Sequence, residues 1–212
     1  MKLIKKGAEA YLYLDDWYGI KVIRKVRISK QYRVKIFDNY LRKSRTLNEA
    51  KLLFSAKSIG VPVPAVFDVD VTNSTIIMEF IPGVLLRDYL PQASNKELRQ
   101  LFEVIGKYVG LLHSNGIFHG DLTTSNMILC NGKPFLIDFG LGGFSKEIEH
   151  LGVDIHLMLR ALESTHYKVI NECFSAFIKG YSQVFNKYNL VLRKVKEIRL
   201  RGRYVIERRV KK

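Results

Sequence analysis

Two short polar segments on either side of a predicted β-hairpin constrain the fold of this chain more than any other feature. The first is His119-Gly120-Asp121-Leu122-Thr123-Thr124-Ser125-Asn126, and the second, twelve residues later, is Asp138-Phe139-Gly140. Two apolar runs lie between them, residues 127–130 and 135–137, joined by Asn131-Gly132, which favours a tight hairpin turn because both residues tolerate positive φ angles. Pairing these runs brings Asn126 and Asp138 together, so the fold must gather carboxylate and carboxamide groups around one point.

This arrangement predicts a site for phosphoryl transfer. Asp138 is the candidate ligand of a Mg²⁺ ion that bridges nucleotide phosphates, and Asn126 is the candidate second oxygen ligand. Asp121 would orient the attacking hydroxyl or water and accept its proton. A triplet such as Asp-Phe-Gly is a weak indicator by itself, because Asp is an ordinary turn former. The combination matches the kinase signature in residue type, order and spacing, and predicts an enzyme that uses ATP and Mg²⁺.

The apolar pattern divides the chain into two lobes and a tail. Before residue 81 it predicts strands at residues 2–7, 10–14, 19–26, 66–71 and 75–80, a turn at Asp15-Asp16, and a long helix at residues 36–58. After Pro82-Gly83 the pattern becomes helical, and Ser94 with Glu97 predicts a capping box for a helix that ends at Gly116. We therefore expect an α+β, small two-lobed protein-kinase-like fold. Its parts are a five-stranded antiparallel N-lobe sheet with one long helix (residues 1–81), a reduced, mainly helical C-lobe (82–192) and a basic C-terminal tail (193–212).

A kinase-like site also requires a loop over the phosphates, a strand lysine and a helix glutamate. Gly7-Ala8-Glu9-Ala10 lies between the first two predicted strands, where that loop belongs, although it has only one glycine. The lysine is Lys21 or Lys25, with Lys25 preferred, and Glu49 is its natural partner because it is the only carboxylate between Asp38 and Asp68. The fifth strand ends at a predicted hinge, where backbone groups near Glu79 and Ile81 would meet adenine beneath Met78.

The net charge of +15 is carried by the two ends of the chain. Residues 1–60 hold 15 Lys/Arg against 5 Asp/Glu, and residues 193–212 hold 10 against 2. This distribution favours a polyanionic partner such as nucleic acid, with a solvated basic face as the alternative interpretation. Near the end of the chain, Arg199, Arg201 and Arg203 alternate around Gly202, a pattern that suits phosphate contact better than a packed helix.

The remaining composition points to a soluble cytoplasmic protein. The two cysteines, Cys130 and Cys173, are far apart and match no metal-ligand spacing. No segment approaches the roughly 18 to 20 uninterrupted apolar residues of a membrane span, and the basic start of the chain lacks the apolar run of a signal peptide. Asp154 is expected to begin a helix and to brace the catalytic loop by accepting backbone hydrogen bonds, with an N-terminal helix cap as the alternative. His150, His156 and His166 are interpreted as structural or exposed.

Several phrases taken together resemble one family. They are Lys6-Gly7-Ala8-Glu9-Ala10, Val22-Ile23-Arg24-Lys25-Val26-Arg27 followed by Lys30-Gln31-Tyr32-Arg33, Arg45-Thr46-Leu47-Asn48-Glu49-Ala50, the segment 119–126, and Ile198-Arg199-Leu200-Arg201-Gly202-Arg203. The chain resembles the RIO-like, atypical Ser/Thr kinases of the KEOPS (EKC) complex, the bud-site-selection kinase family, nearly from end to end. The resemblance implies that Lys25, and not Lys21, contacts ATP and that Glu49 is its ion-pair partner.

The resemblance also implies partners and a role in tRNA modification. Members of this family bind the enzyme that installs threonylcarbamoyl on adenosine of tRNA, here through the C-lobe and tail, and a small KEOPS regulatory subunit through the N-lobe. They act largely as ATPases and also phosphorylate themselves. Two departures from ordinary protein kinases agree with such a role, namely Gly120 in place of the arginine that pairs with a phosphorylated loop and Thr123 in place of the catalytic-loop lysine. No Ala-Pro-Glu triplet follows Gly140, so the platform that docks peptide substrates is expected to be missing.

Two other functions remain open from the sequence. A small-molecule kinase of the aminoglycoside or choline type also uses His-Gly-Asp-Leu, although the segment between Gly140 and the tail leaves little room for a substrate-binding helical lobe. A basic tRNA-binding scaffold with a vestigial nucleotide site is the third hypothesis. Loss of tRNA binding on removal of residues 193–212, but not on Asp121→Ala, would separate binding from catalysis.

Overall fold

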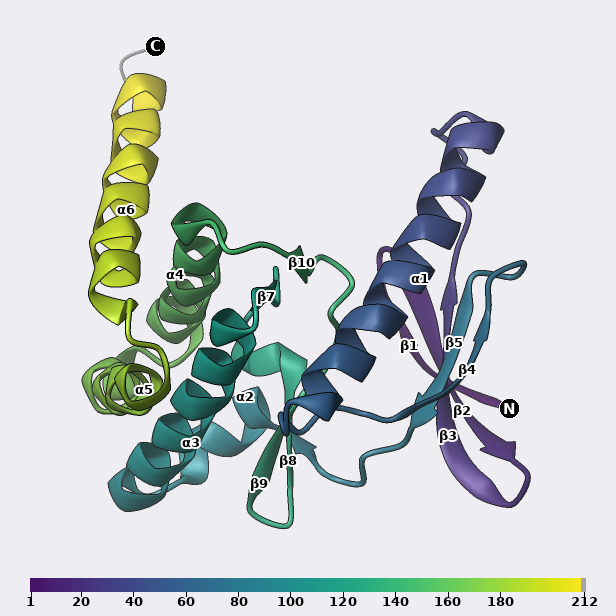
Figure 1. Cartoon of the computed structure of the whole chain (residues 1–212), viewed down its shortest axis with the longest axis horizontal. Coiled ribbons are helices and arrows are strands. Elements are labelled where there is room, and N and C mark those ends of the chain that lie inside the picture. Colours follow the sequence, from purple (N-terminus) through teal and green to yellow (C-terminus); the bar gives the residue numbers. More distant parts are fainter. Residues whose placement is uncertain (211–212) are drawn as a thin grey trace.

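The chain folds into two lobes of different character. The computed structural model describes the backbone of residues 1–210 and the side chains of residues 1–201. In Figure 1 a β-sheet and one long helix form one lobe, and a group of helices forms the other. The predicted fold class, with a five-stranded antiparallel N-lobe sheet and a mainly helical C-lobe, is confirmed.

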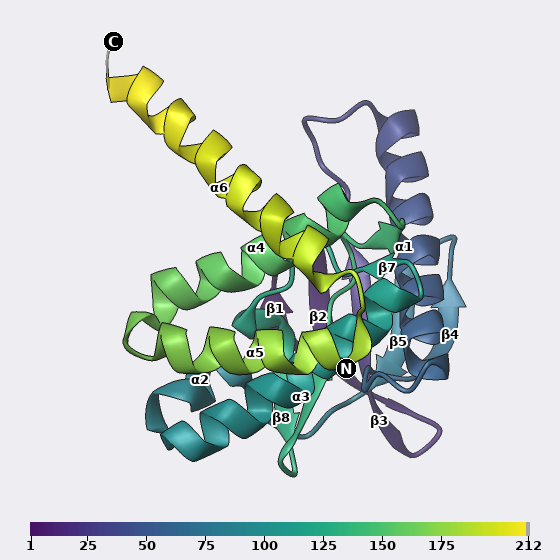
Figure 2. The ribbon, with the colours of Figure 1, turned by 60° about the vertical axis from the view of Figure 1, so that its left-hand side comes forward.

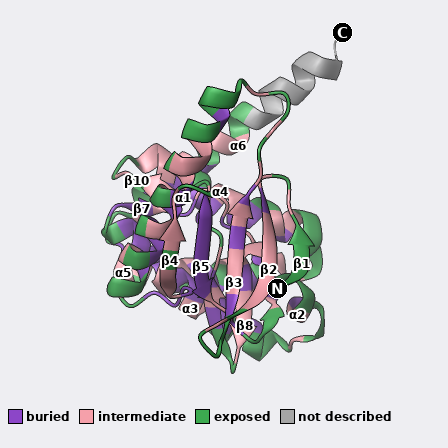
Figure 3. Ribbon diagram, turned by 90° about the vertical axis from the view of Figure 1, so that its right-hand side faces the viewer, coloured by how far each residue is buried: buried purple, intermediate pink, exposed green. Residues whose placement is uncertain are grey.

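The N-lobe consists of one sheet and helix α1. Its strands are β1 (Lys2–Lys6), β2 (Ala10–Trp17), β3 (Ile20–Arg27), β4 (Val66–Asp70) and β5 (Thr75–Glu79), paired antiparallel in the order β1-β2-β3-β5-β4. Helix α1 (Lys35–Ser58) connects β3 to β4. Burial is greatest on β5, which lies inside the sheet, whereas β1 is an exposed edge strand (Figure 3). The face of the sheet that carries Lys25 and the side of α1 that carries Glu49 therefore border the space between the lobes.

The turn predicted at Asp15-Asp16 is wrong, because β2 continues to Trp17 and turns at Tyr18 and Gly19, whose φ angles are 53° and 81°. The two aspartates have other uses. The Asp15 carboxylate accepts a hydrogen bond from Arg24 on the neighbouring strand at 3.0 Å, and the Asp16 carboxylate accepts one from the Gly19 N–H at 3.0 Å. A polar pair that serves cross-strand pairing and turn capping thus resembles a turn in the sequence.

The C-lobe is built from helices and short strands. Its helices are α2 (Leu86–Tyr89), α3 (Asn95–Ser114), α4 (Ile148–Thr165), α5 (Ile170–Val184) and α6 (Tyr188–Val210), and its strands are β6 (Val84–Leu85), β7 (Ile117–Phe118), β8 (Met127–Cys130), β9 (Lys133–Leu136) and β10 (Gly143–Phe144). The predicted capping box of Ser94 and Glu97 is present at the start of α3. The predicted hairpin is present as β8 and β9, with positive φ angles at Asn131 (49°) and Gly132 (74°).

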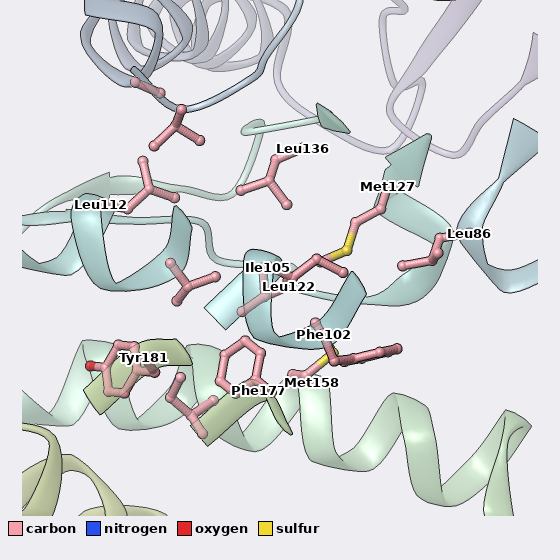
Figure 4. Close-up of a cluster of buried hydrophobic side chains, with 14 of the residues drawn as sticks. Leu86, Phe102, Ile105, Leu112, Leu122, Met127, Leu136, Met158, Phe177 and Tyr181 are labelled. Carbon is pink, nitrogen blue, oxygen red and sulfur yellow. The ribbon is translucent and has the colours of Figure 1, made fainter. Parts of the chain in front are cut away.

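The core of the C-lobe lies between α3, α5 and the hairpin. Figure 4 shows Phe177 beneath Leu122, with Tyr181 on one side and Phe102 and Met127 on the other, and all five side chains are almost fully buried. This packing holds the segment between β7 and β8, which contains Asp121 and Asn126, on a rigid support.

Residues 193–210 of the predicted basic C-terminal tail are part of helix α6. The predicted boundary at residue 193 falls inside that helix, which continues to Val210 and projects away from the body of the molecule (Figure 2). Val191 and Val195 are buried, and α6 packs along α4. The alternation of arginines around Gly202 did not indicate a helix with an apolar face that includes Val191 and Val195.

Candidate active site

A cleft between the lobes contains the polar residues that the sequence singled out. Its polar part has a volume of about 430 Å³ and is lined by Lys25, Asp121, Asn126, Asp138 and the 7–10 loop. An adjoining apolar part of about 300 Å³ lies beside Met78, Ile81 and Ile128. Lys25, Asn126 and Asp138 belong to both parts. The cleft thus has a charged end for phosphates next to an apolar end for a flat ring.

Lys25 lies between the two lobes' carboxylates. Its Nζ atom is 2.7 Å from Glu49 Oε1 on α1 and 2.7 Å from Asp138 Oδ1 in the C-lobe. Lys21, the alternative lysine, is exposed and makes no such contact. Burial alone would lower the pKa of Lys25, but the charges of Glu49 and Asp138 outweigh that effect and raise it. Lys25 is therefore a permanently charged group at the centre of the cleft.

Asp138 is held ready to bind a cation. About half of its side chain, 51%, is exposed to the cleft. Burial favours the protonated acid, but the charge and hydrogen bond of Lys25 outweigh it, so the pKa of Asp138 is lowered and the group is an anion. The residue has a φ angle of 63°, in the left-handed region that non-glycine residues rarely adopt. Such a backbone turns the carboxylate of Asp138 away from the hairpin and towards the cleft.

Asn126 and Asp121 are joined in one local hydrogen-bond set. The Asn126 amide donates to Asp121 Oδ2 at 2.7 Å and to the Asp121 carbonyl at 2.9 Å. The Ile137 N–H donates to the Asn126 carbonyl at 2.9 Å, which sets Asn126 opposite the residue before Asp138. The hairpin thus brings the three predicted residues to one wall of the cleft, as its pairing implied.

Asp154 braces this loop from α4. Its two carboxylate oxygens accept hydrogen bonds from the His119 N–H at 2.5 Å and the Gly120 N–H at 2.7 Å. The expected loop brace is confirmed, but a helix start or a helix cap at Asp154 is wrong, because α4 begins at Ile148 with Glu147 as its N-cap. His119 in turn contacts the Ile137 carbonyl through Nε2 at 3.1 Å, while its Nδ1 faces the Asp121 N–H at 3.3 Å.

The loop over the polar end of the cleft is tied to α1. Gly7, Ala8, Glu9 and Ala10 all line the cleft, and the Gly7 N–H donates to the Ala10 carbonyl at 2.9 Å. The Glu9 carboxylate pairs with Arg45 at 3.1 Å and with Arg33 at 3.2 Å. These ion pairs fix a loop that has too few glycines to wrap closely around phosphates by itself.

The predicted hinge lies at the apolar end of the cleft. Met78, Glu79 and Ile81 all line it. The Glu79 N–H donates to the Ala65 carbonyl at 2.8 Å, and the Glu79 carboxylate accepts from the Ala65 N–H at 3.0 Å. The Glu79 N–H is thus already bonded within the N-lobe, and the contact of Glu79 and Ile81 with adenine stays a prediction.

The sequence did not predict the contacts that two residues, Arg27 and His166, make near the cleft. Arg27 lies two residues after Lys25 on β3 and contacts Glu49, and the alternation of strand faces was the signal for it. His166, interpreted as structural or exposed, is buried, with its Nε2 atom 3.2 Å from Thr124 Oγ1 in the catalytic loop. No spacing rule predicts this contact, because it joins the end of α4 to a loop 42 residues earlier.

The arginines predicted to contact phosphate are paired with acids of α4. Arg199 lies 2.8 Å from Glu163, and Arg201 lies 2.8 Å from Glu149. The side chain of Arg203 lies outside the described residues. The expectation that this segment avoids a packed helix is wrong, because these pairs and the apolar face of α6 hold it against α4.

The described part of the chain has neither a dense cluster of metal ligands nor a membrane-spanning helix. Residues 1–201 contain no cluster of three or more His, Cys, Asp or Glu side chains that could hold a metal ion. A Mg²⁺ ion bound by Asp138 and Asn126 would need phosphate and water oxygens to complete its shell, which is the usual arrangement for this ion with nucleotides. None of the helices in the described structure is long and apolar enough to cross a membrane.

The fold and the cleft together define a protein of the kinase-like class, in which a strand lysine, a helix glutamate and an Asp-Phe-Gly aspartate meet between two lobes. The RIO domain family model matches residues 20–172. The chain is 49% identical to the KEOPS complex subunit Bud32 of Pyrococcus abyssi over 96% of each chain. It therefore belongs to the RIO domain family and, within it, to the family of Bud32.

Longer relatives contain a similar sequence as one part. The chain is 45% identical to a probable bifunctional tRNA threonylcarbamoyladenosine biosynthesis protein of Methanothermobacter thermautotrophicus, over 95% of this chain and 36% of that protein. A protein of the same name from Methanocaldococcus jannaschii is 39% identical over 96% of this chain and 37% of its own length. The chain thus spans about a third of the length of these bifunctional relatives.

Proposed function

We propose that this chain is an ATP-hydrolysing, atypical Ser/Thr kinase subunit of a KEOPS complex in the cytoplasm that supports threonylcarbamoyladenosine modification of tRNA. The names of its relatives support the complex and the pathway. The single observation that carries the chemistry is the position of Lys25, whose Nζ atom lies 2.7 Å from both Glu49 and Asp138. A cation placed between two lobes by two carboxylates is ready to receive a triphosphate.

The residues of the cleft have distinct parts in the proposed reaction. The adenine ring would lie at the apolar end beside Met78 and Ile81, with the phosphates beneath the 7–10 loop near Lys25. Asp138 and Asn126 would hold Mg²⁺, which neutralises phosphate charge when it is bound. Lys25 would then exchange its bond to Asp138 for one to a phosphate oxygen, which leaves the Asp138 carboxylate to the metal.

Asp121 would act on the nucleophile. It lies at the polar end of the cleft, where its carboxylate is oriented by the Asn126 amide at 2.7 Å. In ATP hydrolysis it would orient a water molecule, and in phosphorylation it would orient a Ser or Thr hydroxyl and accept the proton. The same groups can serve both reactions because only the acceptor oxygen differs.

The proposed partners follow the two lobes. We expect the threonylcarbamoyl-transfer enzyme to contact the C-lobe and α6, a small regulatory subunit to contact the N-lobe, and tRNA to contact the basic end that includes Arg199, Arg201 and Arg203. The bifunctional names of the longer relatives support a close association with the modifying enzyme. The acids that pair with Arg199 and Arg201 reduce the charge these two arginines can offer to tRNA.

ATP turnover by the chain in its reconstituted complex tests the proposal. We expect Asp138→Ala and Lys25→Met each to lower kcat by about 100-fold or more, since each removes charge stabilisation at the phosphates. Asp68→Ala is the matched control, because Asp68 is exposed and its carboxylate accepts a hydrogen bond from the N–H of its own neighbour, Val69. Wild-type turnover by the Asp138→Ala complex would refute the catalytic proposal.

A further inference from the structure

The Glu49 carboxylate forms ion pairs with two buried cations, Lys25 and Arg27. Its Oε1 atom is 2.7 Å from Lys25 Nζ, and its Oε2 atom is 2.5 Å from Arg27 Nη2. The three residues are nearly inaccessible to solvent, with exposed fractions of 0% for Glu49, 5% for Arg27 and 6% for Lys25. With Asp138 beyond Lys25, four charges of alternating sign form one series in the order Asp138, Lys25, Glu49 and Arg27, which runs from the C-lobe through α1 back to the end of β3.

Lys25, within this series of charges, cannot keep all of its contacts when nucleotide and metal are bound. In the proposed function Asp138 binds a metal and Lys25 turns towards phosphate, so Lys25 is shared between Glu49 and the nucleotide. A buried carboxylate that depends on a single shared cation is poorly compensated, and losing that partner is costly. The second oxygen of Glu49 avoids this situation, because its bond to Arg27 does not involve the nucleotide.

Arg27 is well anchored for such a role. It is the last residue of β3, and its backbone N–H donates to the Ser74 carbonyl at 3.0 Å. Its guanidinium lies against the turn after Asp138, since a Cβ atom added at Gly140 would lie 3.1 Å from Arg27 Nη2. Arg27 therefore belongs to the strand that carries Lys25. Its side chain lies against the helix that carries Glu49 and the turn that follows Asp138.

We propose that Arg27 is a positioning residue for the nucleotide site, which keeps Glu49 and helix α1 in place while Lys25 moves from Asp138 to the phosphates. This inference rests on the proposed function for the movement of Lys25. In this arrangement the Lys25–Glu49 contact is assembled by residues of the N-lobe alone. Helix α1 needs no phosphorylated loop to bring it to the site.

The alternative role for Arg27 is direct contact with nucleotide. It lines the polar part of the cleft, and its buried Nε atom has no hydrogen-bond partner among the described residues. An arginine that binds phosphate would mainly affect nucleotide affinity, whereas one that positions Glu49 would mainly affect the rate at saturating ATP. Steady-state kinetics separate the two roles.

The experiment uses the full chain in its complex with five variants: Arg27→Gln, Arg27→Lys, Glu49→Gln, the double variant of Arg27→Gln with Glu49→Gln, and Arg24→Gln. Arg24 is the matched control, because it lies on the opposite face of β3 and pairs with Asp15. Each protein is assayed for kcat and KM for ATP, and for amide hydrogen exchange along α1. The exchange measurement does not depend on turnover.

We expect Arg27→Gln to lower kcat by about tenfold or more with KM for ATP changed less than about threefold, and to speed exchange around Glu49. Arg27→Lys restores most of kcat, because it returns a cation to Oε2, and Arg24→Gln behaves as wild type. The double variant is no slower than Glu49→Gln alone, since Arg27 acts through Glu49. The double variant buries no unpaired carboxylate at residue 49, so this comparison holds even where Arg27→Gln alone does not fold.

Three results would overturn the proposal. A raised KM for ATP with unchanged kcat would make Arg27 a phosphate ligand, and unchanged kcat with unchanged exchange would make it dispensable. An additional loss in the double variant relative to Glu49→Gln would show that Arg27 does not act through Glu49. If the wild-type complex has no ATPase activity, the proposed function fails, while the exchange at α1 still reports whether Arg27 holds Glu49.

Discussion

Asp154 connects the catalytic loop to the buried polar residues of the C-lobe. Besides its bonds to the loop, its Oδ2 atom lies 3.4 Å from His113 Nε2, and His113 Nδ1 lies 2.7 Å from the Tyr181 hydroxyl. A carboxylate can only accept, so His113 donates to Asp154 through Nε2. The orientation of Asp154, and through it of His119 and Gly120, is thus fixed by side chains from α3 and α5.

Two other buried histidines predict how stability depends on pH. Burial lowers the pKa of His119, and burial together with the charge of Arg87 lowers the pKa of His166. The unfolded chain therefore binds protons below about pH 6.5 that the folded chain does not bind, and stability falls as the pH falls. The loss of stability is expected between about pH 7.5 and 5.5, around the ordinary pKa of histidine.

Denaturant titrations at several pH values measure this loss. We expect His166→Gln to make the dependence of the free energy of unfolding on pH shallower between pH 6.5 and 5.5, because one of the two groups is removed. His150→Gln, at a partly exposed surface position, is the control. An unchanged slope in the His166→Gln protein would contradict the assignment of a neutral, buried His166.

Where spacing along the chain determines a contact, the sequence predicted which residues lie together. The turn indicated by Asn131-Gly132 predicts a hairpin, and this hairpin brings Asp121 and Asn126 close to Asp138. Lys21 and Lys25 share a strand face, so periodicity left both open, and the burial of Lys25 depends on the arrival of α1 and the C-lobe. Arg27 has the same periodicity, but its contact with Glu49 is a tertiary interaction that no local rule supplies.

Helices α3 and α5 approach so closely that two positions admit only glycine. A Cβ atom at Gly180 would lie 1.9 Å from the Glu103 carbonyl oxygen, and one at Gly106 would lie 2.0 Å from the Phe177 carbonyl oxygen. We expect Gly180→Ala to lower the free energy of unfolding by about 1–3 kcal/mol or more, because the backbones must separate. Thermal or urea unfolding measures this change.

A matched substitution on the exposed side of α5 provides the control for this prediction. Ser175→Ala changes an exposed residue of the same helix and should stay within about 0.5 kcal/mol of wild type. If Gly180→Ala were as stable as Ser175→Ala, the close contact of α3 and α5 would not exist in solution. The contact also supports the catalytic loop, since Phe177 lies below Leu122 of that loop (Figure 4).

Helix α6 offers a different set of free charges from the one its sequence suggested. Arg193 and Lys196 are exposed and have no ion-pair partner among the side chains of residues 1–201, whereas Arg199 and Arg201 are paired. If tRNA meets this helix, replacing both Arg193 and Lys196 by Gln should weaken binding and reduce the slope of log K against log salt by about 1 to 2. Binding isotherms over a range of salt concentrations measure this slope.

Arg199→Gln is the comparison for the α6 prediction. Its effect on tRNA binding should be smaller, because Glu163 already offsets the charge of Arg199. Equal affinity of wild type and the Arg193 and Lys196 double variant would mean that this face of α6 does not meet tRNA.

The elements that the sequence misjudged share one cause. The predicted turn at Asp15-Asp16 and the expectation that the arginines around Gly202 avoid a packed helix both rested on polar residues. In the structure these residues pair neighbouring elements. Asp15 joins two strands, and Arg199 and Arg201 join two helices. Local composition cannot distinguish a charge that faces water from one that faces an opposite charge on another element.

Binding of nucleotide should stabilise the molecule as a whole, because the cleft is formed by both lobes. At Mg²⁺-ATP concentrations about 100-fold above Kd, we expect the free energy of unfolding to rise by about 2.7 kcal/mol. For a chain of this size the melting temperature should then rise by roughly 5–11 °C. Differential scanning fluorimetry, with and without Mg²⁺-ATP, measures this shift.

The two candidate lysines make a matched pair for this measurement. Lys25→Met should lose most of the shift, whereas Lys21→Met, at an exposed position on the same strand, should keep it. Loss of the shift in Lys21→Met but not in Lys25→Met would show that the nucleotide binds near Lys21 and not near Lys25. Removal of Mg²⁺ by EDTA should also reduce the shift, since Asp138 and Lys25 then keep their mutual ion pair.

The bond between Lys25 and Asp138 has a consequence for the order of folding. It joins residues 113 positions apart, whereas the contact of Lys25 with Glu49 spans 24 positions. The strand hairpins and helices of each lobe can form from contacts between near neighbours in the chain, but this bond requires both lobes to be complete and correctly docked. We therefore expect the catalytic centre to be the last part of the molecule to assemble and the first to be lost when the lobes separate.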